Sequence, residues 1–238
     1  NINCSSINNF NHKRIIIVGD SHANMFFNPF KYIAKDNFEI TNFSGNACSF
    51  PVLNDSSLNK SKNCFEGMKN AEIWIENNTN KGDIVFLANN TYYNKLLDYF
   101  SKQKKDEMDR TIYDYLINLN KFSAKLRNKG VMVNFFVYGP RFNGITDAYC
   151  SVEWYRPKSV LKENCYIKKA KFEEPRNKII NYLLLNKHKN IELIYDYLDL
   201  ICDEKSCNAS GYIDSNHIIE DLGVKIILKE NIINNLNN

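Results

Sequence analysis

The chain has 238 residues, of which 44% are hydrophobic, and it carries a formal net charge of +4. This length and apolar content are enough for one domain with a full core, and we expect a single domain over residues 1–238. The small charge and the scattered lysines argue against a nucleic-acid partner, and no apolar run approaches the roughly 18 residues that a membrane span needs.

The predicted elements alternate between short apolar runs and longer amphipathic segments. Residues 13–19 are apolar after two basic positions, as is typical of a parallel strand buried on both faces. A helix is predicted next, over about 21–35, with a break or a new start at Pro29. Further strands are predicted at 38–43, 84–88, 131–138 and 191–198, and further helices at 65–78, 106–128, 173–186 and 218–234.

This alternation predicts the fold class. Five apolar strands separated by helices favour an α/β protein, a three-layer α/β/α sandwich built on a five-stranded parallel sheet. An irregular, aromatic-rich insertion is expected at about 140–172. Because ligands bind outside the carboxyl ends of the strands in open parallel sheets, polar residues that follow the predicted strands are the first candidates for a site.

Several polar residues do follow the predicted strands. Ser21 comes after the first strand, in the run Gly-Asp-Ser-His, Gly45 comes after the second, and two asparagines at 89–90 come after the third. Asp214 and His217 follow the fifth strand through a loop. All of these residues are therefore expected at one edge of the sheet.

A serine, a histidine and an aspartate are the three parts of a nucleophilic acyl-transfer site. We predict that Ser21 is the nucleophile and that His217 is its general base. Asp214, three residues before the histidine, is predicted to orient the imidazole ring. The alternatives are structural, because Ser21 could cap the helix that follows it and Asp214 could be the N-cap of the last helix.

Seven cysteines occur, and six of them form three couples that are close in sequence. The couples are Cys48 with Cys64, Cys150 with Cys165, and Cys202 with Cys207. No Cys-x-x-Cys pair or zinc-finger spacing is present, which argues against a metal site. We expect three disulfides and an oxidising compartment, although six cysteines allow about 15 pairings and reduced, buried thiols are the alternative. Cys4 is left over.

Two motifs carry a resemblance to a known family. The run Gly-Asp-Ser-His at 19–22, together with Asp214-x-x-His217, resembles the SGNH (GDSL-type) hydrolases. More narrowly, the chain is similar to SGNH domains that are fused to, or work with, bacterial membrane O-acyltransferases of the acyltransferase-3 family. Those domains share Gly-Asp-Ser-His, a cysteine followed by a proline as at 47–51, and the cysteine, aspartate and histidine spacing of 200–223. The resemblance covers about residues 13–230 and implies a flavodoxin-like SGNH hydrolase fold.

The resemblance also implies an oxyanion hole. Its donors would be the backbone N–H of Ser21, a glycine after the second strand and an asparagine after the third, which here correspond to Gly45 and Asn90. Asn89 is the second choice for the asparagine. The family's Gly-x-Asn-Asp block is degraded, because the chain reads Ala-Asn-Asn-Thr at 88–91.

His22 and Trp154 are the candidates for contact with the substrate. His22 adjoins the predicted nucleophile and could instead support the site by packing, or compete as the base. Trp154 belongs to the aromatic insertion, together with Tyr149, Tyr155 and Tyr166. We expect this insertion either to form a sugar-stacking wall or to pack as an ordinary excursion of the chain.

The predicted function is serine-dependent O-acyl transfer in the cell envelope. An acyl group, expected to be acetyl, would pass through an ester on Ser21 to a hydroxyl of a polysaccharide or other glycan. As the resemblance implies, the acyl group would come from a membrane acyltransferase domain in the same chain or a partner chain, and would derive from acetyl-CoA. This chain would itself need no cofactor or metal and would not insert into the membrane. The expected location is periplasmic or otherwise extracytoplasmic, with any signal or membrane part outside this chain.

Two other functions are left open by the sequence. The same three residues could use water as the acceptor, in a secreted carbohydrate esterase or deacetylase. Alternatively, the chain could be a catalytically silent glycan-binding module. The sequence does not separate transfer from hydrolysis, because the two reactions differ only in which acceptor reaches the acyl-enzyme.

Overall fold

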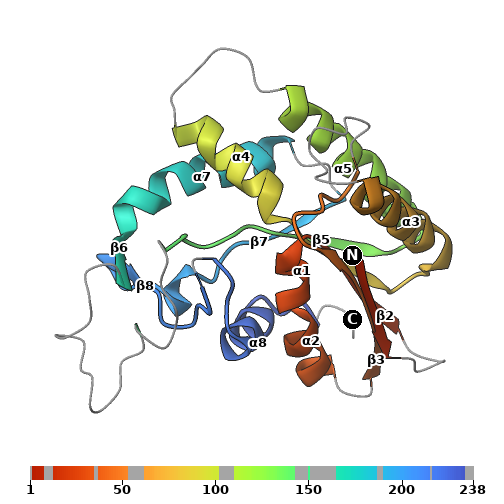
Figure 1. Ribbon diagram of the computed structural model, residues 1–238, viewed down its shortest axis with the longest axis horizontal. Coiled ribbons are helices and arrows are strands. Elements are labelled where there is room, and N and C mark those ends of the chain that lie inside the picture. The colour runs from red at the N-terminus through yellow and green to blue at the C-terminus, as the bar shows by residue number, and fades with distance from the viewer. Residues whose placement is uncertain are drawn as a thin grey trace.

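The computed structural model describes residues 2–7, 13–34, 37–52, 62–101, 110–142, 150, 165–186, 190–214 and 216–233. Helices cover both faces of a central sheet, which makes three layers (Figure 1). The predicted α/β/α sandwich is therefore confirmed. None of the described helices is both long and apolar enough to cross a bilayer.

The main sheet has the strand order β1-β3-β2-β4-β5-β7. These strands are β1 (Ile2–Ile7), β2 (Lys13–Gly19), β3 (Phe38–Gly45), β4 (Ile84–Ala88), β5 (Met132–Phe136) and β7 (Glu192–Ile194). The five strands from β2 onward are parallel, as predicted, and taken in chain order they lie in the flavodoxin-like arrangement 2-1-3-4-5. β1 pairs antiparallel with β3 and was not predicted.

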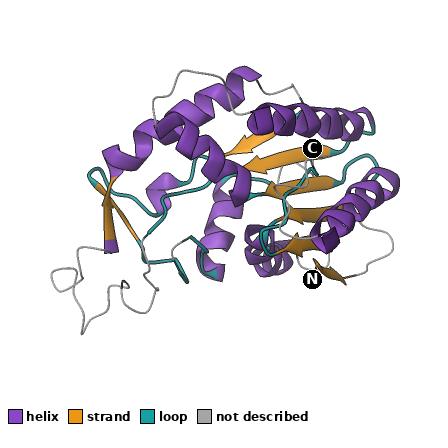
Figure 2. Cartoon of the chain, turned by 45° about the horizontal axis from the view of Figure 1, so that its top comes forward, coloured by secondary structure: helices purple, strands orange, loops and turns teal. Residues whose placement is uncertain are grey.

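Helices flank this sheet on both sides (Figure 1). One side carries α1 (Ser21–Met25), α2 (Phe27–Ala34) and α8 (Glu220–Lys229), and the other carries α3 (Lys62–Asn78) and α5 (Arg110–Asn128). α4 (Asn90–Ser101) packs on α5 and on α7 (Lys169–Asn186), and the 3₁₀ helix η5 (Leu198–Leu200) packs on α8. A small antiparallel pair, β6 (Tyr166–Lys168) and β8 (Ser206–Asn208), lies away from the β1 edge (Figure 2).

The central strands are apolar because both of their faces are covered. Residues 15–18 of β2 have no exposed surface, and every residue of β4 is buried. Phe26, at the junction of α1 and α2, packs edge-on against Phe86 of β4 and Phe136 of β5. This core fixes the carboxyl ends of the strands, where the site lies.

The first predicted helix is broken, and Pro29 lies at the new start, as predicted. α1 ends at Met25, and Pro29 is the third residue of α2, where a missing N–H leaves no intrahelical bond unmade. Pro29 also contacts α8 at Gly223, where a Cβ would lie only 2.6 Å from the proline ring. The proline therefore begins one helix and packs against another.

Several predicted boundaries differ from the structure. Residues 90–101 form α4, which was not predicted, whereas the predicted helix over 106–128 corresponds to α5. The predicted strand over 191–198 is reduced to Glu192–Ile194, because the chain then turns into η5. The last predicted helix, over 218–234, is α8 and is shorter at both ends.

The three predicted disulfides are present. They join Cys48 to Cys64, Cys150 to Cys165, and Cys202 to Cys207. The first links the loop after β3 to the start of α3, and the third closes the turn before β8. Cys4 lies in β1, opposite Phe43 of β3.

Candidate active site

The first parallel strand ends at a position that accepts only glycine. Gly19 pairs with Ser44 of β3 on one side and with Ala88 of β4 on the other. A Cβ at Gly19 would lie 1.9 Å from the carbonyl oxygen of Ala88. Three strand ends are therefore drawn together at one edge of the sheet, and Asp20 and Ser21 follow directly.

Asp20, and not Ser21, caps the helix that follows. Its Oδ1 accepts the backbone N–H of His22 at 3.0 Å, as expected of an N-cap aspartate. Asn42 of β3 also donates to the side chain of Asn24, which ties α1 to the sheet. The hydroxyl of Ser21, at the first position of α1, is thus not the helix cap that the sequence left open.

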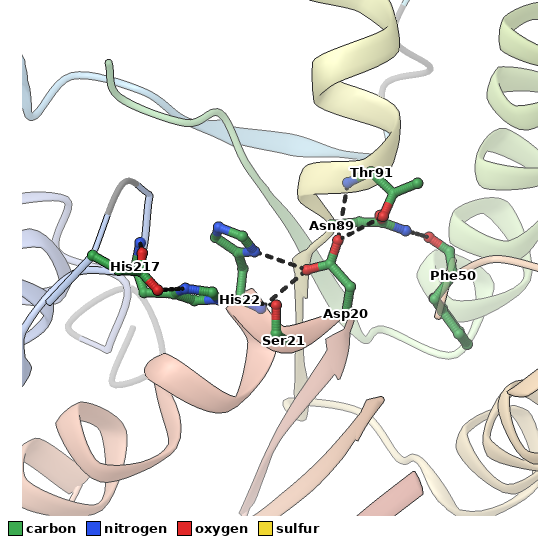
Figure 3. A network of polar contacts seen from close by, with 8 residues as sticks. Asp20, Ser21, His22, Phe50, Asn89, Thr91 and His217 are labelled. Atoms are coloured by element: carbon green, nitrogen blue, oxygen red, sulfur yellow. Dashed lines mark hydrogen bonds and ion pairs between the residues drawn. The ribbon is translucent and has the colours of Figure 1, made fainter. Parts of the chain in front are cut away.

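Ser21, His217 and Asp214 form a continuous chain of hydrogen bonds. The Nε2 atom of His217 lies 2.9 Å from the Oγ of Ser21. Its Nδ1 atom lies 2.7 Å from the Oδ2 of Asp214. Figure 3 shows the serine and the ring facing each other from opposite sides of the site. A proton on Nδ1, donated to the carboxylate, leaves Nε2 free to accept the serine O–H.

The side chain of Asp214 stabilises the turn before α8 and does not cap that helix. Its Oδ1 accepts the backbone N–H groups of Asn216 and His217, whereas the N-cap of α8 is Ile219. Burial alone would raise the pKa of Asp214, but these two backbone bonds and the His217 ring outweigh it and lower the pKa below 3.8. The lowered pKa keeps Asp214 as the charged carboxylate that accepts these bonds at neutral pH.

The ring of His22 stacks on the ring of His217. The two imidazoles stack with their centroids 4.4 Å apart. The rings of His22 and Tyr138 meet in a T-shaped contact with their centroids 4.9 Å apart. The Nδ1 atom of His22 lies 3.1 Å from Asp20, while its buried Nε2 has no partner in the described part of the chain. At 2% exposure the side chain has no face open to solvent, so its predicted contact with substrate has no support in this arrangement.

The other carboxylate oxygen of Asp20 connects the Asp20–His22 pair to α4. The Oδ2 of Asp20 accepts both the backbone N–H and the hydroxyl of Thr91, at 2.9 and 3.0 Å (Figure 3). Asp20, Thr91 and Tyr138 were not named by the sequence reasoning as parts of the site. An aspartate directly before a helix is an N-cap signal that could have identified the first of them.

Two of the predicted oxyanion donors lie where elements end or begin at this edge of the sheet. Gly45 is the last residue of β3, and Asn90 is the first residue of α4. Asn89 is committed elsewhere, because its Nδ2 donates to the carbonyl of Phe50 at 2.8 Å (Figure 3). Between the two asparagines, Asn90 is therefore the better placed to face a ligand, and its role stays a prediction.

A cleft opens beside the hydrogen-bonded chain. Its cavity volume is small, about 20 Å³, and the surrounding space, about 440 Å³, is open to solvent between α4, the end of β5 and the turn before α8. Asn90, Tyr93, Asn94, Tyr138, Arg141 and Asn216 are among its lining residues. Asn216 precedes His217, and Tyr138 touches His22, so the cleft adjoins the candidate nucleophile.

The aromatic insertion lies mostly outside the described residues. Trp154, Tyr149 and Tyr155, predicted as a sugar-binding wall, belong to that part of the chain. Tyr166, the fourth aromatic residue, is in β6 and is half-buried.

The fold and the site together define a class of protein. A doubly wound parallel sheet with a serine after its first parallel strand, and an Asp-x-x-His pair before its last helix, is typical of hydrolases of the Gly-Asp-Ser type. The chain belongs to the SGNH family. The family model described as "SGNH domain (fused to AT3 domains)" matches residues 3–220.

Of two other comparisons of this chain, with curated proteins and with solved structures, only the second gives similar proteins. No curated protein matches it. Among solved structures, it is similar to a putative acylhydrolase from Bacteroides fragilis, with 15% identity and a TM-score of 0.45 over 96% of this chain and 88% of that one. It is also similar to a GDSL-like lipase from Bacteroides thetaiotaomicron, with 12% identity and a TM-score of 0.46 over 94% and 88% of the two chains.

Proposed function

We propose that this SGNH domain is a serine-dependent O-acyltransferase that passes an acyl group, acetyl in our expectation, to a hydroxyl of a cell-envelope glycan. The observation that carries the proposal is the chain of hydrogen bonds from Ser21 through His217 to Asp214. The family description, which names fusion to AT3 domains, supports a membrane acyltransferase domain as the source of the acyl group.

The first half of the reaction loads Ser21. Its Oγ attacks the carbonyl carbon of the acyl donor while its proton passes to Nε2 of His217. When the tetrahedral intermediate collapses, the bond to the donor's leaving group breaks, and that group takes the proton from His217. Asp214 stabilises the imidazolium that exists between these two events.

The second half of the reaction transfers the acyl group. A glycan hydroxyl gives its proton to His217 and attacks the carbonyl of the Ser21 ester. The ester bond to Ser21 then breaks, and the serine oxygen recovers a proton from His217. We assign the negative charge on the carbonyl oxygen in both halves to the N–H of Ser21, the N–H of Gly45 and the side chain of Asn90.

An extracytoplasmic location suits this role. Three disulfides are stable in an oxidising compartment, and the acceptor glycan would be found there. The acyl group would derive from acetyl-CoA on the other side of the membrane, so this chain would receive it and would bind no cofactor of its own.

A covalent probe tests the nucleophile. We expect a fluorophosphonate to label the protein once, and Ser21→Ala to abolish the labelling. Ser123→Ala is the matched control, because the Ser123 hydroxyl is buried in α5 and bonds to the carbonyls of Leu119 and Asn120. Equal labelling of wild type and Ser21→Ala would show that another residue reacts and would contradict the proposal. No labelling of either protein would also contradict it and would favour the glycan-binding module.

A second assay separates transfer from hydrolysis. The protein is loaded from p-nitrophenyl acetate and offered neutral and acidic oligosaccharides, and acetylated products are counted by mass spectrometry. Transfer to a glycan in preference to water supports the acyltransferase. Rapid release of acetate with no transfer to any glycan would instead identify a carbohydrate esterase.

A further inference from the structure

One cation lies among the residues that line the cleft beside Ser21. Arg141 is exposed, and the other described residues that line the cleft are apolar, tyrosine, asparagine, glycine or proline. No described carboxylate lines the cleft, and no ion pair of Arg141 occurs with the described residues. Its neighbours Pro140 and Phe142 are buried, and Phe142 packs on Tyr212 at 4.9 Å. The backbone that carries this charge is therefore held in place.

Two buried hydroxyls on the wall of the same cleft lack partners. Tyr93 and Tyr138 are 1% and 5% exposed, and neither hydroxyl has a hydrogen-bond partner in the described part of the chain. Burial raises the pKa of both phenols, so each hydroxyl keeps its proton and can donate as well as accept. Buried hydroxyls are usually paired, so bound water is the expected partner of these two.

We propose that this cleft is the acceptor site and that it selects a glycan carrying an anionic group, a carboxylate or a phosphate, which Arg141 binds. The glycan part of this inference rests on the proposed function, whereas the charge preference rests on Arg141. A guanidinium pairs with either oxyanion through two parallel N–H bonds.

The rest of the cleft suits a sugar. Asn90, Asn94 and Asn216 offer both donors and acceptors to ring hydroxyls. Asn216 adjoins His217, so an acceptor hydroxyl seated beside it lies next to the base that must take its proton. The anionic group at Arg141 would fix which hydroxyl that is.

The test measures binding without chemistry, in the Ser21→Ala protein. Dissociation constants are measured by NMR titration for cellobiouronic acid against cellobiose, and for glucose 6-phosphate against glucose. We expect an anionic sugar to bind about fivefold more tightly than its neutral counterpart, as for a partly exposed ion pair, and the advantage to shrink in 0.5 M NaCl.

Two arginine variants identify the cation. Arg141→Gln is expected to remove the preference, and Arg141→Lys to keep part of it. Arg127→Gln is the matched control, because Arg127 is also exposed but lies at the end of α5, outside the cleft. It should leave the preference unchanged.

The outcomes separate the possible ligands and the two proposals. Preference for the uronic acid or for the sugar phosphate supports an anionic acceptor and says which anion it carries. Equal affinity for charged and neutral sugars, binding of none of them, or equal loss in Arg127→Gln overturns the inference. Labelling of Ser21 without a charge preference defeats this inference alone, whereas a charge preference without labelling defeats only the acyltransferase.

Discussion

Replacing His22 separates two roles that its position allows, support for the ring of His217 and proton transfer. The two rings are stacked 4.4 Å apart, and His22 is 2% exposed. A stacked aromatic pair contributes about 0.5–1.5 kcal/mol beyond its buried area. If His22 supports His217 by stacking, His22→Ala should therefore lower kcat by about twofold to tenfold.

His22→Phe keeps the ring and removes both nitrogens. It loses the 3.1 Å bond to Asp20, which is charge-assisted and worth about 1.5–3 kcal/mol. It also removes a buried Nε2 that has no partner in the described part of the chain, which costs the native protein about 1–3 kcal/mol. The two changes nearly cancel, so we expect a free energy of unfolding within about 1 kcal/mol of wild type and kcat within about threefold. His22→Ala should lose about 3 kcal/mol through its cavity.

The assays are urea unfolding and the pH dependence of p-nitrophenyl acetate turnover. Because His22 does not reach the surface, KM should be unchanged in both variants. If folded His22→Phe loses at least as much kcat as His22→Ala, or if its pH–rate profile moves, His22 carries a proton and the stacking account is wrong.

Three further predictions concern the site and its frame. Since hydrogen bonds lower the pKa of Asp214 below 3.8, its stabilising contribution is present above that pH and is lost only as the pH falls through the lowered value. The circular dichroism spectrum should therefore not change through this group between neutral pH and about pH 4; an unfolding transition above about pH 4 that disappears in Asp214→Asn would contradict this. Gly19→Ala places a Cβ 1.9 Å from a β4 carbonyl and should cost about 3 kcal/mol or more, measured by urea unfolding; wild-type stability would show that the strand ends can separate. Replacing Cys48 and Cys64 by serine opens a loop closed across 16 residues and should cost about 3 kcal/mol, with labelling of the nucleophile retained in the folded fraction; an unchanged urea midpoint would show that the bond does not stabilise the fold.

The parallel sheet could be predicted from the sequence because local pattern decides it. Strands buried on both faces must be continuously apolar, as residues 15–18 and 84–88 are, and the carboxyl ends of parallel strands share an edge. Ser21 and His217 are 196 residues apart in sequence, and they could be expected to meet because both follow strands that end at this edge. The cysteine pairs were predictable for a different reason, since each pair is close in sequence.

What the sequence could not supply depends on contacts between distant segments. β1 is a short strand of mixed polarity, and no local pattern indicates that it pairs antiparallel with β3. α4 begins at asparagines that are also typical of a turn, and its packing on α5 and α7 completes it. The cleft with Arg141 joins α4, the end of β5 and the turn before α8, and no local pattern indicates that these meet.

The departure at 88–91 from the family's Gly-x-Asn-Asp block has a physical explanation in the same contacts. Thr91 donates its backbone N–H and its hydroxyl to Asp20, whose other oxygen caps α1 and meets His22. An aspartate at this position would bring a second carboxylate to about 3 Å from the first, in a buried site with no described cation to separate them. Threonine supplies the donor that the buried carboxylate needs. The threonine that stands in place of the block's aspartate therefore holds the N-cap of the helix that carries Ser21. The same carboxylate contacts His22, whose ring stacks on the ring that must take the serine's proton.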